Sequence, residues 1–199
     1  MITQRRMAAL AAILLLVSGV VLGGHGLFIR SKALAAQMLL ERAWEQTVAR
    51  HRPVKAWAWA DTWPVARINF PRLARSAVVL EAGGGEALAF GPAHVAATPL
   101  PGENGTSVIA GHRDTHFDFI KELKPGDEID ITTRDGKTLA FRMTGSAIVH
   151  ADASGIDAQG TTPRLALVTC YPFDALGQAP LRYVVFAEEA GVSTRASAR

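Results

Sequence analysis

The stretch LALVTCYPF, Leu165–Phe173, decides most about this chain, because it joins a strand-like pattern to the only cysteine. Apolar residues run from Leu165 to Val168, and a proline follows Cys170 after one aromatic residue. A short apolar run bounded by turn residues is typical of a β-strand. Cys170 is therefore predicted to stand at the end of a strand.

Short runs of the same kind fill the chain from Pro64 onward and alternate with turn signals. The Asp135-Gly136 pair predicts a hairpin with a two-residue primed turn. One short helix is expected in the segment GHRDTHFDFIKEL, 111–123. Many short strands at this spacing indicate a closed barrel or a sandwich. The expected strands are 65–70, 76–80, 87–90, 106–111, 128–133, 139–145, 147–150, 165–170 and 181–188.

The N-terminal segment Met7–Ile29 carries no charged residue and is interrupted mainly by Ser18 and His25. About 20 apolar residues in a helix cross a bilayer core of about 30 Å. Arg5 and Arg6 precede the segment, which predicts a cytoplasmic N-terminus. The alternative is a cleaved signal peptide that ends at the ALA of residues 33–35. The apolar run exceeds the usual signal core, which favours an uncleaved anchor, and both alternatives export the rest of the chain.

This pattern divides the chain into a cytoplasmic tail (1–6), an anchor (7–29), a juxtamembrane helix and linker (30–63), a β domain (64–190) and a disordered tail (191–199). Pro53 ends the helix. All four tryptophans precede residue 64. They could form an aromatic belt at the membrane, but packing is favoured for residues 57–63. The net charge is only +3, and no basic stripe lies beyond residue 60, which argues against nucleic-acid binding.

Export makes the single cysteine unusual, because cysteines outside the cytoplasm normally form disulfides. Cys170 is either inert and buried, an intermolecular bridge, or a reactive nucleophile. A nucleophile needs a base or a cation nearby. All six histidines precede Cys170, and His112 ends an apolar strand-like run, whereas His94 is expected in a solvated loop.

His116 lies four residues after His112, so the two could share a helical face and bind a metal. No third ligand is evident and no dense acidic cluster suggests calcium. We therefore expect no metal and no cofactor.

Arg182 shares one face of its predicted strand with Val184 and Phe186. An arginine among apolar residues is costly unless it meets an anion or lines a cleft. The alternative is an arginine at a strand end that extends into solvent. The spacing leaves both alternatives open.

Three motifs in this order, AGHRDTHF (110–117), LVTCYPF (167–173) and PLRYVVFA (180–187), resemble the sortases, which are membrane-anchored cysteine transpeptidases. Residues 167–170 match the later part of the TLxTC-type motif of that family, whereas Ala166 stands where the longer motif has threonine. The segments GHRDTHF, TCYPFDA and LRYVV look most like the proteobacterial, Gram-negative class. The resemblance covers residues 64–188.

The resemblance implies a mainly β fold, a closed eight-stranded sortase-type barrel with short helices behind a transmembrane helix. It implies that His112, Cys170 and Arg182 are the catalytic residues. Cys170 would cleave an LPXTG-like C-terminal sorting signal through a thioester, His112 would transfer protons, and Arg182 would bind carbonyl oxygens. Thr169, His116 and Tyr171 are further candidates for substrate binding, and the loop 151–163 resembles the one that contacts the sorting signal.

The implied partners are a target protein with the sorting signal, an amine acceptor that the sequence does not identify, and a membrane. The expected location is the bacterial inner membrane, crossed once, with the catalytic domain on the periplasmic side. Two alternatives stay open. One is an envelope cysteine peptidase that hydrolyses the thioester, and the other is a non-enzymatic β domain in which Cys170 senses oxidants.

Overall fold

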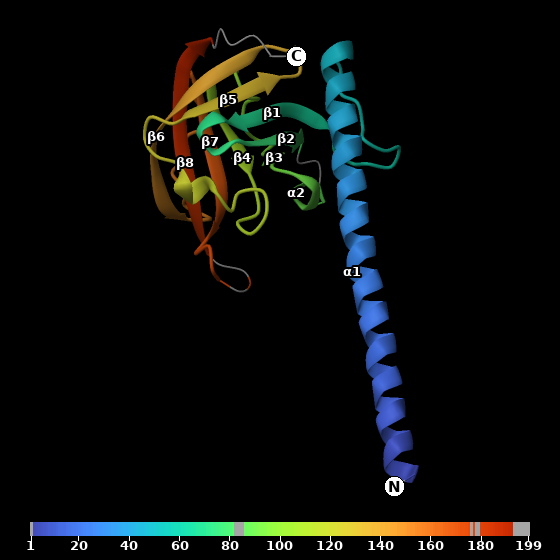
Figure 1. Cartoon of the computed structure of the whole chain (residues 1–199). Helices are drawn as coiled ribbons and strands as arrows, with labels where there is room; N and C mark the ends of the chain where they lie inside the picture. Colours follow the sequence, from blue (N-terminus) through green and yellow to red (C-terminus); the bar gives the residue numbers. More distant parts are fainter. Residues whose placement is uncertain (1, 82–85, 176, 178–179, 193–199) are drawn as a thin grey trace. The chain divides into compact units, whose positions relative to one another are not determined.

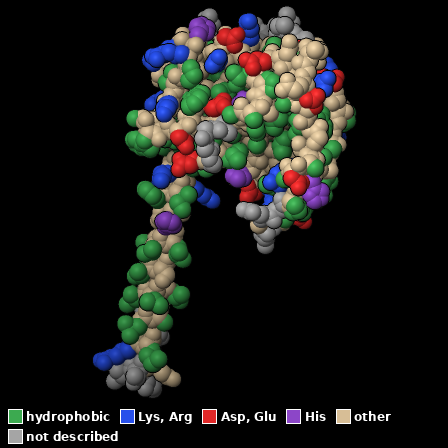
Figure 2. Space-filling view, turned by 180° about the vertical axis from the view of Figure 1, so that it is seen from behind, with side chains coloured by type: hydrophobic (Ala, Val, Ile, Leu, Met, Phe, Trp, Pro, Cys, Tyr) green, Lys and Arg blue, Asp and Glu red, His purple; other side chains and the backbone are tan. Residues whose placement is uncertain are grey.

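The computed structural model describes residues 2–81, 86–175, 177 and 180–192. It begins with one helix, α1 (Ile2–Arg50), shown in blue in Figure 1. The chain forms two compact units, of which the first ends at Met38 and the second begins at Leu39. The exposed surface of the first unit is largely hydrophobic (Figure 2). Among the described residues, α1 contains a stretch long and apolar enough to cross a membrane, within Leu10–Arg50.

The second unit is built on a closed barrel of eight strands in the order β1-β2-β3-β4-β7-β8-β6-β5 (Figure 1). The β2–β3 and β4–β7 pairs are parallel, and the other neighbours are antiparallel. The closed barrel is therefore confirmed, and the sandwich is excluded. The strands are β1 (Pro64–Phe70), β2 (Arg75–Glu81), β3 (Ala93–His94), β4 (Gly105–Ala110), β5 (Glu128–Thr133), β6 (Thr138–His150), β7 (Pro163–Tyr171) and β8 (Leu181–Val192).

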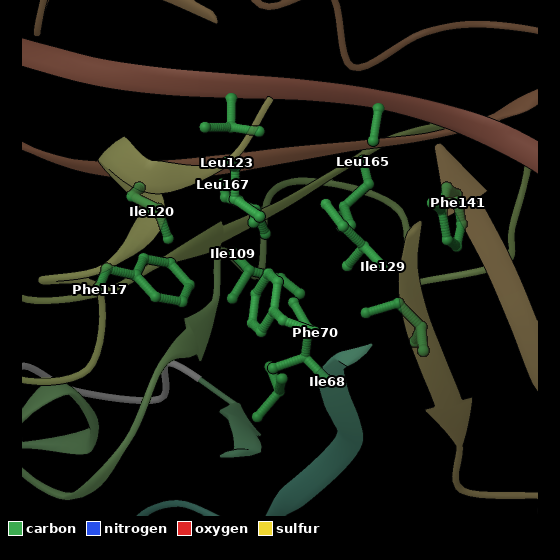
Figure 3. Close-up of a cluster of buried hydrophobic side chains, with 14 of the residues drawn as sticks. Ile68, Phe70, Ile109, Phe117, Ile120, Leu123, Ile129, Phe141, Leu165 and Leu167 are labelled. Carbon is green, nitrogen blue, oxygen red and sulfur yellow. The ribbon is translucent and has the colours of Figure 1, made fainter. Parts of the chain in front are cut away.

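The barrel interior is filled by large apolar side chains from alternate positions of the strands (Figure 3). On β7 the inward residues are Leu165 and Leu167, which are fully buried with Ile109 of β4 and Val185 of β8. Since side chains alternate along a strand, the residues between them point outward. Strand β7 thus has one face in the core and one on the outside of the barrel, and Cys170 lies on the outer face.

The end of α1 belongs to the barrel unit and covers the outside of β2. Leu40 and Trp44 are buried there against Val78 and Leu80. The one-turn helix α2 (Ala87–Phe90) completes this layer, and Trp57 meets the ring of Phe90 edge-on at 5.0 Å. The packing predicted for residues 57–63 holds for Trp57 and Trp63 but is wrong for Trp59, which is 85% exposed.

Three local predictions are corrected by the structure. Residues 87–90 form the helix α2 and not a strand, because two alanines and a leucine favour a helical turn that Gly91 ends. The two strands expected over 139–145 and 147–150 are one long strand, β6, with an irregularity between Met143 and Gly145.

The predicted hairpin joins β5 to β6, but its turn is longer than two residues. In this turn the Gly136 amide donates to the Thr133 carbonyl, and the Thr133 amide donates to the Lys137 carbonyl. Gly136 adopts a left-handed φ of 81°.

Other elements lie close to their expected positions. The helix expected within 111–123 is the short 3-10 helix η2 (Ile120–Glu122), preceded by turns. A second 3-10 helix, η1 (Pro71–Leu73), links β1 to β2. Strand β8 continues to Val192, and the rest of the predicted disordered tail, 193–199, lies outside the described residues. The two-residue strand β3 is too short to leave a periodic signal in the sequence.

The contact of Trp44 with β2 makes a testable prediction. Trp44→Ala should lower the free energy of unfolding by about 3–5 kcal/mol, since it empties a buried site of an aromatic ring. Trp59→Ala is the matched control, because its ring is exposed, and should change stability by no more than about 0.5 kcal/mol. Urea unfolding of the full chain in detergent measures both. Equal effects of the two substitutions would show that the end of α1 does not pack on the barrel.

Candidate active site

Cys170 and Arg182 come from the neighbouring strands β7 and β8, and His112 follows the end of β4 on the other side of β7. Cys170 pairs directly with Arg182 in the β7–β8 ladder. On the other side, Ala110 of β4 pairs with Val168, and the Gly111 amide donates to the Val168 carbonyl at 3.0 Å. His112 follows directly, so the chain brings it beside the end of β7 where Cys170 stands.

Cys170 and Arg182 share the outer face of the barrel. Directly paired residues of an antiparallel ladder project to the same side of the sheet. Cys170 is a half-buried free thiol, and Arg182 is half-buried as well. His112 has an exposed side chain. The three residues predicted to be catalytic thus stand at one end of adjacent strands and remain accessible.

An apolar strip on the same outer face leads along the strands toward this end. Its buried members are Val108 of β4, Ala166 of β7 and Val184 of β8. Ile156, from the loop that precedes β7, packs against the strip. The half-buried members are Val95, Val149, Ile156, Val168 and Phe186. Only the half-buried side chains of the strip are accessible beside the site.

The backbone before His112 is fixed by two tight contacts. The buried Thr169 hydroxyl donates to the Gly111 carbonyl at 2.7 Å. A Cβ added to Gly111 would lie 2.6 Å from the fully buried ring of Phe117, so only glycine fits there. The Phe117 amide in turn donates to the His112 carbonyl at 2.9 Å. The position of His112 is therefore set by the strand that carries Cys170 and by the core.

His116 lies in the turn that follows His112. Burial lowers the pKa of His116, and the nearby charge of His112 lowers it further, while Asp114 and Asp118 oppose the shift. A neutral His116 is therefore favoured beside His112 at neutral pH. His116 adds a second imidazole to the neighbourhood without adding a second positive charge.

Thr169 and Tyr171, two further candidates, flank Cys170 in β7 and so project from the opposite side of the strand. The Thr169 hydroxyl already donates to the Gly111 carbonyl. Tyr171 packs edge-on against Phe173, with ring centroids 6.2 Å apart. The structure thus brings His112, Cys170 and Arg182 together, places His116 nearby, and turns Thr169 and Tyr171 away.

Two features were missed at the level of the sequence. Arg113, next to His112, donates from Nη2 to the carbonyls of Ala175 and Gly177 in the loop between β7 and β8. In the sequence, Arg113 is marked only by its charge and by its place directly after His112. His94 is 2% exposed rather than solvated, with Nδ1 3.3 Å from a Glu81 carboxylate oxygen and Nε2 3.0 Å from the Pro99 carbonyl.

No metal centre is found in the part of the chain that the structure describes, since no three His, Cys, Asp or Glu side chains gather there in a suitable cluster. Cys170, His112 and Arg182 offer the chemistry of a thiol beside an imidazole and a guanidinium. A thiolate beside two potential cations can attack a carbonyl carbon and form a thioester.

The Thr169–Gly111 bond makes a prediction for stability. Thr169→Val keeps the shape but leaves the buried Gly111 carbonyl without its hydroxyl partner, which should cost about 1–3 kcal/mol of unfolding free energy. Thr106→Val on β4 is the matched control, since no hydrogen bond of its hydroxyl is found among the described residues. Urea unfolding measures both. A Thr169 variant as stable as the control would contradict the role given to this bond.

Known proteins are similar to this chain in sequence and in fold. The sortase domain family matches residues 68–190. Sortase D of Bacillus subtilis (strain 168) is 28% identical over 186 residues, which cover 86% of this chain and 93% of the relative.

Two solved sortase structures share the barrel. Sortase C-1 from Actinomyces oris has a TM-score of 0.59 at 26% identity, over 65% of this chain and 74% of that one. Sortase A from Corynebacterium diphtheriae has a TM-score of 0.62 at 20% identity, over 81% of this chain and 86% of that one. The family match spans more than half of the chain, so this protein belongs to the sortases, a family of cysteine transpeptidases.

Proposed function

We propose that the protein cleaves an LPXTG-like sorting signal near the C-terminus of a target protein and transfers the new acyl end to an amine. The observation that carries the proposal is the direct pairing of Cys170 with Arg182, beside the strand end that leads into His112. In the proposed reaction Cys170 is the nucleophile, Arg182 is the cation that binds the oxyanion, and His112 carries the proton.

The reaction has two halves. The Cys170 thiolate attacks the scissile carbonyl carbon, and the bond to the leaving nitrogen breaks as His112 gives that nitrogen a proton. A thioester on Cys170 and a free amine result. An incoming amine then attacks the thioester, His112 takes its proton, and the Cys170 thiolate leaves.

Arg182 stabilises the oxygen that becomes negative in each half. Its place opposite Cys170 in the ladder supports this role, because a charge within reach of the reacting carbonyl acts where charge develops in the transition state. The half-buried setting limits competition from water.

The apolar strip beside Cys170 supports a sorting signal with apolar residues as substrate. An extended peptide can contact the half-buried side chains of the strip, Val149, Val168 and Phe186, and Ile156 supplies part of the border. We assign the chain to the proteobacterial, Gram-negative class of sortases on the wording of GHRDTHF, TCYPFDA and LRYVV.

A mass measurement tests the reaction. The full chain in detergent, incubated with a panel of LPXTG-like peptides and no amine, should gain the mass of the N-terminal peptide fragment. The gain should be absent in Cys170→Ala and reversed by hydroxylamine. Arg182→Met should lower kcat by about 10²–10³-fold, the usual effect of losing one oxyanion donor.

Arg134→Met is the control for Arg182, because Arg134 is an exposed arginine in the β5–β6 turn, and it should retain wild-type activity. Added amine should yield the transfer product. Hydrolysis alone in its presence would favour a cysteine peptidase. No adduct with any peptide, together with reversible oxidation of Cys170, would favour a redox-sensing domain.

We further propose that α1 is a single-pass anchor in the plasma membrane, with the N-terminus in the cytoplasm and the barrel outside. The apolar stretch of α1, the arginines at positions 5 and 6, and the extracytoplasmic location of sortases support this.

The proposed topology predicts that a membrane-impermeant maleimide labels Cys170 in cells whose outer membrane has been opened but whose inner membrane is intact. Because Cys170 is the only cysteine of the chain, any maleimide found on the protein has reacted with Cys170. Labelling that appears only after the inner membrane is lysed would place the barrel in the cytoplasm.

A further inference from the structure

Both chain neighbours of His112 are hydrogen-bonded to β7 or to the loop that follows it. On one side the Gly111 carbonyl accepts from the Thr169 hydroxyl in β7. On the other side Arg113 Nη2 donates to the Gly177 carbonyl at 2.6 Å and to the Ala175 carbonyl. The pairing of β4 with β7 has ended before this point, at Ala110 and Val168.

The loop that Arg113 binds begins at a residue that packs on the barrel. Phe173 packs against the main core and meets the ring of Tyr183 at 5.4 Å. Lys121 of η2 lies over the ring of Phe173, with its Nζ 5.1 Å from the ring centroid. Arg113 therefore ties the histidine segment to a loop that starts from the barrel core at Phe173.

The guanidinium of Arg113 is in a setting that packing alone does not explain. Its Nη1 is buried and has no hydrogen-bond partner among the described residues. A buried unpaired N–H costs about 1–3 kcal/mol, which an apolar side chain of similar length would avoid. The two carbonyl bonds of Nη2 are what an apolar side chain could not replace.

We propose that Arg113 is a positioning residue that holds His112 in register with Cys170. The inference rests on the proposed function, because it assigns His112 the proton transfers of that reaction. Arg113 acts through the backbone: its bonds to the β7–β8 loop fix the residue after His112, as Thr169 fixes the residue before it. It touches neither the thiol nor the substrate.

The test compares Arg113→Met with Arg113→Lys in the full chain in detergent. Methionine keeps an apolar stem but has no donor, so His112 is held from one side only. We expect kcat for a fluorescence-quenched LPXTG-like peptide to fall about tenfold, since a displacement of about 1 Å can cost up to 10²-fold, while KM changes less than twofold. Lysine can donate to both carbonyls and should restore most of kcat.

Arg134→Met serves as the control and should retain the wild-type kcat. Wild-type kcat in Arg113→Met, with only a lower unfolding temperature, would show a purely structural role and overturn the inference. A rise in KM with kcat unchanged would also overturn it, because Arg113 would then contact substrate. Arg113→Leu, which also lacks a donor, replaces the methionine variant if the latter does not fold.

A second readout separates this inference from the proposed function. If no peptide acylates the wild-type protein, the proposed function fails. The rate at which iodoacetamide alkylates Cys170 still reports on the histidine. Arg113→Met should slow alkylation in the same direction as His112→Ala and by a smaller factor. Alkylation at the wild-type rate, while His112→Ala is slow, would overturn the positioning role.

Discussion

The parallel pairing of β4 with β7 is the constraint on which the rest of the site depends. It matches Ala110 to Val168, and the Gly111 amide extends the ladder by one bond. The antiparallel partner of β7 is β8, which sets Arg182 against Cys170. A slip of one residue in either pairing would turn side chains to the opposite face. The register of three strands thus gathers groups that lie far apart in the sequence.

The same alternation that builds the barrel also sorts the roles of the residues in β7. Leu165, Leu167 and Thr169 face inward, where two fill the core and the third bonds to the Gly111 carbonyl. Ala166 and Cys170 face outward, one as part of the apolar strip and the other as the proposed nucleophile. Stability and reactivity are therefore carried by opposite faces of one strand.

The sequence predicted what depends on local pattern. The apolar runs of β7 and β8 have clear periodicity, and the single exported cysteine with His112 and Arg182 in order led to the sortase resemblance. What failed depends on contacts distant in sequence. Residues 87–90 are apolar because they cover β2, which does not require a strand. His94 was predicted to be solvated because its partner Glu81, 13 residues earlier, comes beside it only when β2 pairs with β3. The bonds of Arg113 cross from one loop to another and leave no periodic signal.

The central claim is that one outer face of the barrel carries the peptide to Cys170, between His112 and Arg182. A crystal structure with a sorting-signal peptide bearing a chloromethyl ketone, bonded to Cys170, tests it most directly. We expect the peptide to lie along the half-buried Val149, Val168 and Phe186, with Arg182 in hydrogen-bond reach of the carbonyl next to the thioether. A peptide on any other surface, or Arg182 turned away from that carbonyl, would contradict it.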